Sequence, residues 1–213
     1  MELLHRIVGP AFTNVWVLGE EASREAIAVD TATPSAPWVL EALATQGWTL
    51  KLIVSTHRHW DHIGDNTAVA DATGAQIAVH TLDRHGLEHP VQSLGAPFTI
   101  VPSLPAVELA EGGLVAFGTI RLEVLHTPGH TEGSVCLLER EAGLLFSGDT
   151  LFAGAWGRTD LPGGDDAAMV DSISRLARLE PTLQVFPGHG STTTIERERS
   201  WMDLVARQGR LFA

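Results

Sequence analysis

Thiols are almost absent from this sequence of 213 residues, which contains a single cysteine, Cys136. One cysteine excludes an intrachain disulfide, and it excludes a metal site built from several thiolates. We therefore expect a reducing compartment, the cytoplasm. Cys136 lies in an apolar segment, and we interpret it as a small residue of the core.

Long apolar stretches are also missing. No run approaches the roughly 18 to 20 residues that a membrane-spanning helix needs. The amino end, MELLHR, has no basic stretch followed by an apolar one, so we expect no cleaved signal.

Positive charge is scarce, because 14 Lys and Arg residues stand against 26 Asp and Glu residues, a formal net charge of −12. Sequence-independent binding to nucleic acid depends on Lys and Arg that neutralise phosphates. Adsorption to an anionic membrane surface depends on the same residues. We therefore expect neither nucleic acid nor a membrane as a partner.

The remaining composition is that of a folded protein, with 44% apolar and 19% charged residues. Apolar runs rich in Val, Ile and Leu predict buried strands at 13–18, 26–29, 50–55, 76–79, 114–117, 120–125, 134–138, 144–147 and 184–186. Helical patterns occur at 38–46, 65–73, 166–179 and 194–207, and a proline-containing loop is expected at 91–105. Because strands and helices interleave without strict alternation, we expect one α/β domain over 1–213, with two sheets face to face and helices outside.

Histidine is the unusual residue type, and the segment after the predicted strand 50–55 holds His57, His59, Asp61 and His62. Burying unpaired imidazoles and a carboxylate would cost several kcal/mol. A metal ion is a suitable partner, because imidazole and carboxylate ligands suit zinc or iron. The alternation of His57 and His59 directs both rings the same way, whereas Asp61 and His62 point to a neighbouring position. The segment therefore accommodates one metal or two.

Three later predicted strands end in the same manner, with His130, Asp149 or His189 beside a glycine. Glycine allows a sharp turn and a close approach of the backbone to a ligand. Each of these residues alone is a weak signal, but together they extend the first cluster. The other histidines are interpreted as solvated residues: His5, His80, His85, His89 and His126.

These motifs, in this order and over residues 56–190, resemble the metallo-β-lactamase superfamily. Asp149 is similar to a bridging aspartate of the glyoxalase II type of hydrolase, which the zinc β-lactamases lack. The segments GDTLF at 148–152, GRTD at 157–160 and PGHG at 187–190 look like those of short bacterial glyoxalase II-like proteins. The resemblance implies an αββα sandwich.

The resemblance also implies a dinuclear site, with two divalent ions that we expect to be zinc, with iron or manganese as alternatives. By the family pattern, the first ion takes His57, His59 and His130, the second takes Asp61, His62 and His189, and Asp149 bridges both. A water shared by two such ions ionises near neutral pH and attacks a substrate carbonyl. Asp61 and Asp149 are then the expected catalytic residues.

The expected substrate is a small-molecule thioester. A thiolate whose conjugate acid has a pKa of about 8.5 leaves nearly unassisted, whereas an amide nitrogen needs a general acid, and none stands out. Similarity to glyoxalase II implies S-2-hydroxyacylglutathione hydrolase-like activity. Arg158 is the candidate for gripping a substrate carboxylate, with an ion pair to Asp160 or Asp165 as the alternative. Only residues 190–213 follow His189, so we expect no C-terminal glutathione-binding helical domain.

Other functions remain open. The GRTD segment is also similar to persulfide dioxygenases, in which one iron would take His57, His130 and Asp149, a set that leaves positions for thiol and oxygen. Another hydrolase, or a non-catalytic member that binds without reacting, is a further alternative. Acidic charge disfavours a nuclease, and Asp149 disfavours a β-lactamase. Apolar positions in the last predicted helix leave room for a homo-oligomer.

Overall fold

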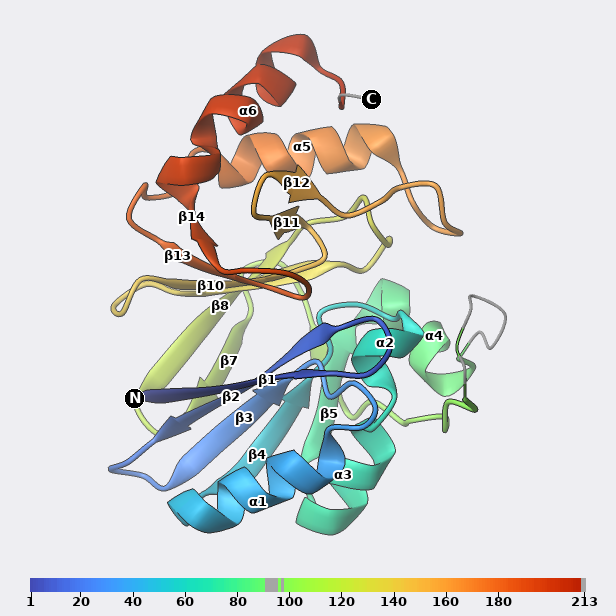
Figure 1. The fold of residues 1–213 in the computed structure, drawn as a ribbon, viewed down its shortest axis with the longest axis vertical. Coiled ribbons are helices and arrows are strands. Elements are labelled where there is room, and N and C mark those ends of the chain that lie inside the picture. The colour runs from blue at the N-terminus through green and yellow to red at the C-terminus, as the bar shows by residue number, and fades with distance from the viewer. Residues whose placement is uncertain (91–95, 97, 212–213) are drawn as a thin grey trace.

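The computed structural model describes residues 1–90, 96 and 98–211. Two six-stranded sheets face each other, and helices cover the outer face of each, which confirms the predicted αββα sandwich (Figure 1). The first sheet comes from the amino-terminal half. Its spatial order is β1 (Glu2–Val8), β2 (Thr13–Glu20), β3 (Glu25–Val29), β4 (Thr49–Val54), β5 (Gln76–His80) and β6 (Val107–Leu109).

The second sheet comes from the carboxyl-terminal half. Its spatial order is β14 (Thr193–Thr194), β13 (Gln184–Pro187), β10 (Leu144–Gly148), β9 (Val135–Glu139), β8 (Ile120–His126) and β7 (Leu114–Phe117). A two-stranded sheet adds β11 (Leu151–Phe152) and β12 (Ala155–Trp156). The helices are α1 (Ala36–Gln46), α2 (Trp60–Ile63), α3 (Asn66–Thr73), α4 (Arg84–Glu88), α5 (Asp166–Leu176) and α6 (Ile195–Gln208), with a 3₁₀ turn at Thr81–Asp83.

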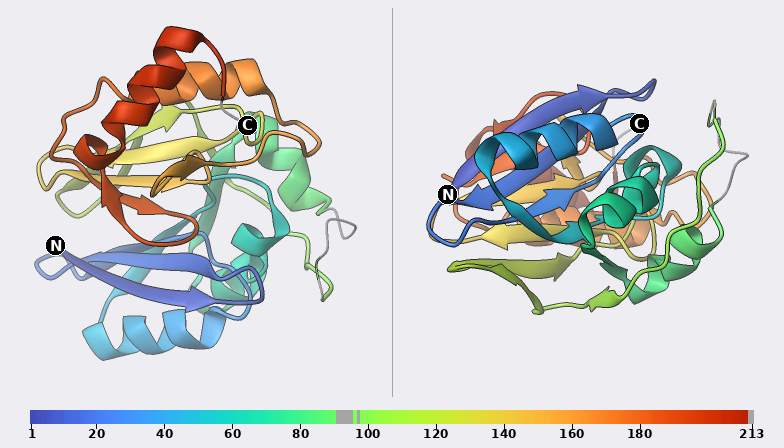
Figure 2. Two further views of the ribbon diagram at one scale, coloured as in Figure 1. Left: turned by 45° about the horizontal axis from the view of Figure 1, so that its top comes forward. Right: turned by 90° about the horizontal axis from the view of Figure 1, so that it is seen from below.

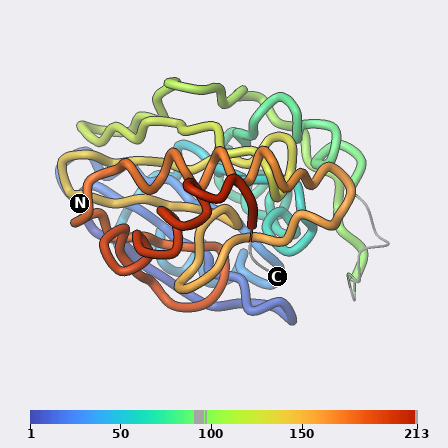
Figure 3. Tube along the Cα trace, turned by 90° about the horizontal axis from the view of Figure 1, so that it is seen from above, coloured from blue at the N-terminus to red at the C-terminus, as the bar shows by residue number. Residues whose placement is uncertain are grey.

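Three apolar layers hold this arrangement together. One lies between the first sheet and helices α1 and α3, one between the two sheets, and one between the second sheet and helices α5 and α6. The turned views show the helical layers on opposite sides of the paired sheets, with α5 and α6 crossing the second sheet (Figures 2 and 3). Cys136 is fully buried in the third layer, as predicted, and burial raises the pKa of its thiol to about 11.

Strand β2 illustrates why continuous apolar runs form the inner strands. All of its residues are buried, and side chains alternate between the two faces of a strand. Val15 and Val17 therefore pack toward the helices, whereas Trp16 and Leu18 pack between the sheets. Because both faces of the strand are covered, its middle is a continuous apolar run, whereas its polar residues lie at the two ends.

Every predicted strand and helix has a counterpart, but several short elements were missed. They are β1, β6, β11, β12, β14, α2 and α4. Strand β1 is largely exposed and lies at the edge of its sheet, where pairing of Glu2–Val8 with β2 holds it in place. The predicted loop 91–105 falls partly outside the described residues, and its described part from 98 to 105 has neither helix nor strand.

Strand direction brings the candidate residues to one edge. Strands β3 and β4 are parallel, and β8, β10 and β13 run the same way because β9 is antiparallel to both β8 and β10, while β10 and β13 are parallel. The carboxyl ends of same-direction strands meet at one edge of a sheet, where α/β proteins place ligand sites. Among the described residues, no helix combines the length and apolar character needed to cross a membrane.

Candidate metal centre

The structure brings all seven predicted metal ligands together between the two sheets. They form overlapping groups in which the ligand atoms lie within 4.8 Å of one another: His57, His59 and His130; His57, His62 and Asp149; and Asp61, His62 and His189. The residues come from the loops after β4, β8, β10 and β13 and from α2. Residues up to 132 positions apart in the sequence thus converge on one centre. This agrees with the expectation that the ligand-type residues at the ends of later strands extend the first cluster.

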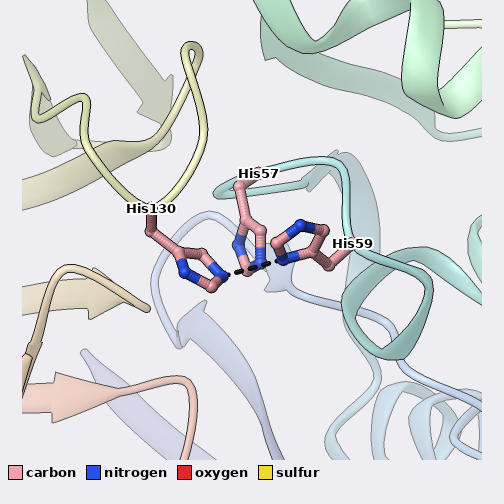
Figure 4. A group of neighbouring side chains, drawn as sticks. All are labelled: His57, His59 and His130. Carbon is pink, nitrogen blue, oxygen red and sulfur yellow. Dashed lines mark hydrogen bonds between the residues drawn. The ribbon is translucent and has the colours of Figure 1, made fainter. Parts of the chain in front are cut away.

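The first group consists of three imidazoles that point toward one another (Figure 4). The Nδ1 atom of His59 lies 2.8 Å from Nε2 of His130. The ring of His57 lies 4.8 Å, centroid to centroid, from each of the other two and is steeply inclined to both. All three side chains are buried.

The second group adds a carboxylate to two imidazoles. Nε2 of His62 lies 3.1 Å from Nε2 of His189, and Oδ2 of Asp61 lies 3.3 Å from the same His189 atom. His62 has no exposed surface, whereas His189 and Asp61 are partly exposed. The second group therefore faces the surface from which a substrate would enter.

Asp149 lies between the two groups. Its Oδ2 atom is 3.5 Å from Nε2 of His130 in the first group and 3.5 Å from Nε2 of His189 in the second. Its Oδ1 atom is 3.5 Å from Nε2 of His62. This position is the one that a bridging carboxylate requires.

Several buried atoms of the centre fit a cation. Within the described residues, Nε2 of His57, Nε2 of His59 and Oδ1 of Asp149 are buried and have no hydrogen-bond partner. An unpaired buried polar atom costs on the order of 1–3 kcal/mol. The close nitrogen pairs, such as His59 with His130, share at most one proton each. The donors, imidazole and carboxylate, suit zinc, iron or manganese, so the residues fit two divalent ions.

Local electrostatics set the protonation of these groups. Burial lowers the pKa of His57 well below its usual value and lowers that of His59 to about 3, helped by neighbouring imidazoles. Both rings are therefore neutral at pH 7, the form that binds metal. Burial raises the pKa of Asp149, but the charge on His62 and a hydrogen bond with His189 outweigh it and keep the carboxyl ionised.

His189 behaves differently. Burial lowers its pKa, but hydrogen bonds with the carboxylates of Asp149 and Asp61 more than compensate and raise the pKa to about 10. A proton on His189 therefore competes with a metal ion for the ring nitrogen, and metal binding should release this proton.

Asp30 supports the centre, although the sequence analysis did not identify it as a functional residue. Its Oδ2 atom lies 3.0 Å from Nδ1 of His62, and its carboxylate also accepts hydrogen bonds from the backbone and hydroxyl of Thr56. Carboxylate–histidine pairs of this kind fix the tautomer and orientation of a ligand ring. The available signal was its place directly after β3, at the edge where the other ligands gather.

Two further buried residues, also missed, join the loops of the centre. Asp83 accepts hydrogen bonds from the backbone of Arg58, the hydroxyl of Thr131 and the backbone of Gly133, so it holds the loops of His57 and His130 together. Asn14 donates from its amide to the carbonyls of Pro187 and Gly190, on either side of His189. Neither residue belongs to a recognisable sequence motif, because each is a single polar residue far in sequence from the groups that it contacts.

The glycine before His189 has a steric reason. A side chain at Gly188 would collide with Oδ1 of Asp149 and approach Cε1 of His62 to 2.6 Å. Only glycine lets the backbone of this loop pass so close to both groups.

Arg158 lines the cavity in front of the centre, but its guanidinium already has a carboxylate partner. Nε and Nη2 each donate to one oxygen of Asp160 at 2.7 Å, which is the ion pair that the alternative interpretation predicts. Its backbone carbonyl lies 2.7 Å from Nδ1 of His130 and so orients that ring. A role of the Arg158 side chain in substrate binding stays a prediction.

The histidines interpreted as solvated lie outside the centre. His5, His85 and His89 are exposed, whereas His80 and His126 are half-buried and stack on each other with ring centroids 4.1 Å apart. His85 and His89 also form a small surface group with Glu88. His126 lies 2.9 Å, through Nε2, from the carbonyl of Glu132 and supports the loop of His130 rather than the centre itself.

Asp30→Asn should weaken metal binding by about 10- to 100-fold, because the carboxylate behind a ligand histidine raises its basicity and fixes its orientation. A competition titration with a chromophoric chelator measures this affinity. Asp71→Asn, on the exposed face of α3, is the matched control. Unchanged affinity in Asp30→Asn would show that His62 needs no such partner.

His130→Ala should lose metal, whereas His126→Ala, in the same loop, should keep its full content. His130 faces two other imidazoles, but His126 faces a backbone carbonyl and His80. Elemental mass spectrometry of both purified variants measures the difference. Loss of metal from His126→Ala would mean that His126, and not His130, is the metal ligand in this loop.

Similarity to known proteins agrees with the geometry. Hydroxyacylglutathione hydrolase of Gloeobacter violaceus is 39% identical over 190 residues, which are 89% of this chain and 68% of the relative. The crystal structure of the B3 metallo-beta-lactamase BLEG-1 superimposes with a TM-score of 0.85 at 34% identity, over 96% of this chain and 99% of the other. That of ETHE1 from Myxococcus xanthus gives 0.81 at 27% identity, over 97% and 85%.

Residues 8–189 match the family described as the metallo-beta-lactamase superfamily. This range begins at the end of β1 and ends at the final predicted ligand, His189. The convergent ligands, the paired sheets and this match lead to one conclusion: the chain belongs to the metallo-beta-lactamase superfamily.

Proposed function

We propose that the protein is a metal-dependent hydrolase of thioesters, of the hydroxyacylglutathione hydrolase type, with two divalent ions, zinc first and iron or manganese as alternatives. The observation that carries the proposal is the position of Asp149, 3.5 Å from His130 on one side and 3.5 Å from His189 on the other. A carboxylate between two ligand groups is suited to hold two ions at a fixed separation. A relative named hydroxyacylglutathione hydrolase supports the choice of substrate class.

Two bound ions supply a Lewis acid for the substrate carbonyl and hydroxide at neutral pH. The protein itself supplies the geometry. Asp61 projects from α2 beside His189 and is placed to orient the attacking water. The cavity in front of the centre has a volume of about 490 Å³, enough for a small molecule, and Phe152, Leu161 and Ala11 help to line it.

The residues that line the cavity indicate which class of leaving group the site favours. Of the described residues around it, the acidic side chains are Asp61 and Asp149, both within the ligand groups. Among these described residues, therefore, no uncommitted acid is near enough to protonate an amide nitrogen. A thiolate does not need one, which favours a thioester.

The test combines metal content with activity. The protein, purified without added metal, is analysed by elemental mass spectrometry and assayed with S-lactoylglutathione, with a β-lactam, and for oxygen uptake with a glutathione persulfide. Two metal ions per chain and thioester hydrolysis are the expected result. One iron per chain with oxygen uptake would establish the dioxygenase alternative, in which His57, His130 and Asp149 hold the iron. Hydrolysis of the β-lactam alone would also overturn the proposal.

The expected setting of this activity is the cytoplasm, with a small molecule as the only necessary partner. Both, and the homo-oligomer that the last helix would allow, stay predictions.

A further inference from the structure

Two cavities adjoin the metal centre and share His59 and Trp60 as a common wall. The first, of about 490 Å³, opens directly on the ligands. The second, of about 330 Å³, extends past Leu82 and Pro162 toward α4. A thioester whose carbonyl reacts at the centre must place its carrier thiol in one of these two cavities or across both.

Arginine and lysine could recognise a carboxylate on the carrier, and the second cavity has one such residue, Arg58. Its Nη1 donates to Oδ1 of Asp83 at 2.7 Å and to Oε2 of Glu132 at 3.1 Å. Its Nη2 donates to the carbonyl of Pro162 at 2.9 Å. The Arg58 side chain is only 19% exposed and its guanidinium faces two carboxylates, so the charge is both enclosed and neutralised.

The first cavity likewise has one guanidinium, Arg158, and Asp160 occupies it in the bidentate geometry that a substrate carboxylate would use. A hydrogen bond from Arg158 lowers the pKa of Asp160 to about 2, so this carboxylate is ionised across the neutral range. The single lysine, Lys51, pairs with Glu25 in the first sheet and lines neither cavity. Of the described residues around the two cavities, every arginine therefore has a carboxylate partner.

The carboxylates around the second cavity outnumber its arginine. Arg58 faces both Asp83 and Glu132, which leaves one negative charge at the second cavity, and Glu132 is 59% exposed there. The second cavity is otherwise lined by the apolar side chains of Leu82, Trp60 and Pro162 and by the imidazoles of His85 and His89. Phe152 and Leu161 line the first cavity beside the ligand groups. An anionic carrier would approach a negative rim and would have to displace an existing ion pair.

We propose that the carrier thiol is uncharged, with apolar or neutral polar groups around the sulfur, and that carriers bearing carboxylates, glutathione among them, are the poorer substrates. This inference rests on the proposed thioester hydrolase function and adds the chemical class of the leaving thiol. Whichever cavity the carrier occupies, it meets several apolar side chains, and the guanidinium group there is already paired with a carboxylate.

The test uses two thioesters that differ only in one carboxylate: S-lactoyl-N-acetylcysteine and its methyl ester. Their kcat/KM values are divided by their rates of hydroxide-catalysed hydrolysis, because the ester also changes the pKa of the leaving thiol. We expect the normalised kcat/KM of the methyl ester to be about 10-fold higher, and the ratio to shrink at high ionic strength, since salt screens exposed charges. An acid hydrolysed as fast as its ester, or faster, would overturn the inference.

Two variants examine the role of the ion pair. Asp160→Asn frees the guanidinium of Arg158, so it should raise kcat/KM for the acid by about 5-fold and change that for the ester by less than 2-fold. In the double variant Asp160→Asn/Arg158→Ala this gain for the acid should disappear, and a gain that persists would contradict the inference. Failure of the metal-loaded protein to hydrolyse the acid, the ester and S-lactoylglutathione would instead reject thioester hydrolysis itself, and the inference with it.

Discussion

Asp149→Ala should lower kcat/KM for an S-2-hydroxyacyl thioester by more than about 1,000-fold and reduce the metal content from two ions per chain to one or fewer. Loss of a residue that only supports a ligand costs about 10- to 100-fold, and loss of the bridging ligand should cost more. The carboxylate of Asp149 lies at 3.5 Å from ligand atoms of both groups, so its removal opens both metal positions at once. Steady-state kinetics and elemental mass spectrometry measure the two effects.

Asp71→Ala serves as the control, because Asp71 is exposed on α3 and lies outside both cavities. Far-UV circular dichroism of both variants should match the parent, since the carboxylate of Asp149 contacts the side chains of the candidate ligands and takes no part in the pairing of the strands. An Asp149→Ala protein with full activity and two metal ions would remove the bridging role.

Metal removal has the second large effect that we expect. Dialysis against a strong chelator should reduce thioester hydrolysis below detection, and addition of zinc, manganese or ferrous ions should restore it to different degrees. The imidazoles and carboxylates of the centre alone provide no nucleophile of sufficient strength. Assays after each addition identify the ion that supports the fastest turnover.

The same treatment should lower the melting temperature by about 10 °C. Ligand binding to the folded state stabilises by roughly 4 kcal/mol at a thousandfold excess over Kd, and a chain of this size shifts by about 2–4 °C per kcal/mol. The unpartnered buried atoms of His57, His59 and Asp149 are the structural origin of this sensitivity. Full activity after complete removal of metal, verified by elemental analysis, would contradict a metal-dependent mechanism.

The ligand set could be predicted from the sequence because each member follows a strand and is local to a motif. His57 and His59 alternate directly after β4, and His189 stands beside Gly188, whose missing side chain leaves room for Asp149. A strand end of this kind can be recognised from a few consecutive residues of the sequence. The inner strands were predictable for a similar reason, because burial on both faces favours continuous apolar runs such as residues 15–18 of β2.

The supporting residues could not be predicted, because their roles exist only between distant segments. Asp30 contacts His62, 32 positions away, and Asn14 contacts Pro187, 173 positions away. The same reason explains why four strands were not predicted: the edge strand β1 and the two-residue strands β11, β12 and β14. They are strands because they pair with neighbouring strands, and their own side chains show no clear strand pattern.

Apolar periodicity and strand-end motifs, which are local properties of the chain, predicted the layers of the fold, the edge at which the site forms and the order of the candidate ligands. The distances from Asp149 to both ligand groups, the carboxylate behind His62 and the choice of Asp160 over Asp165 as the partner of Arg158 became apparent only in the folded chain. These features depend on distances of a few ångströms between side chains whose approach is set by the packing of two sheets.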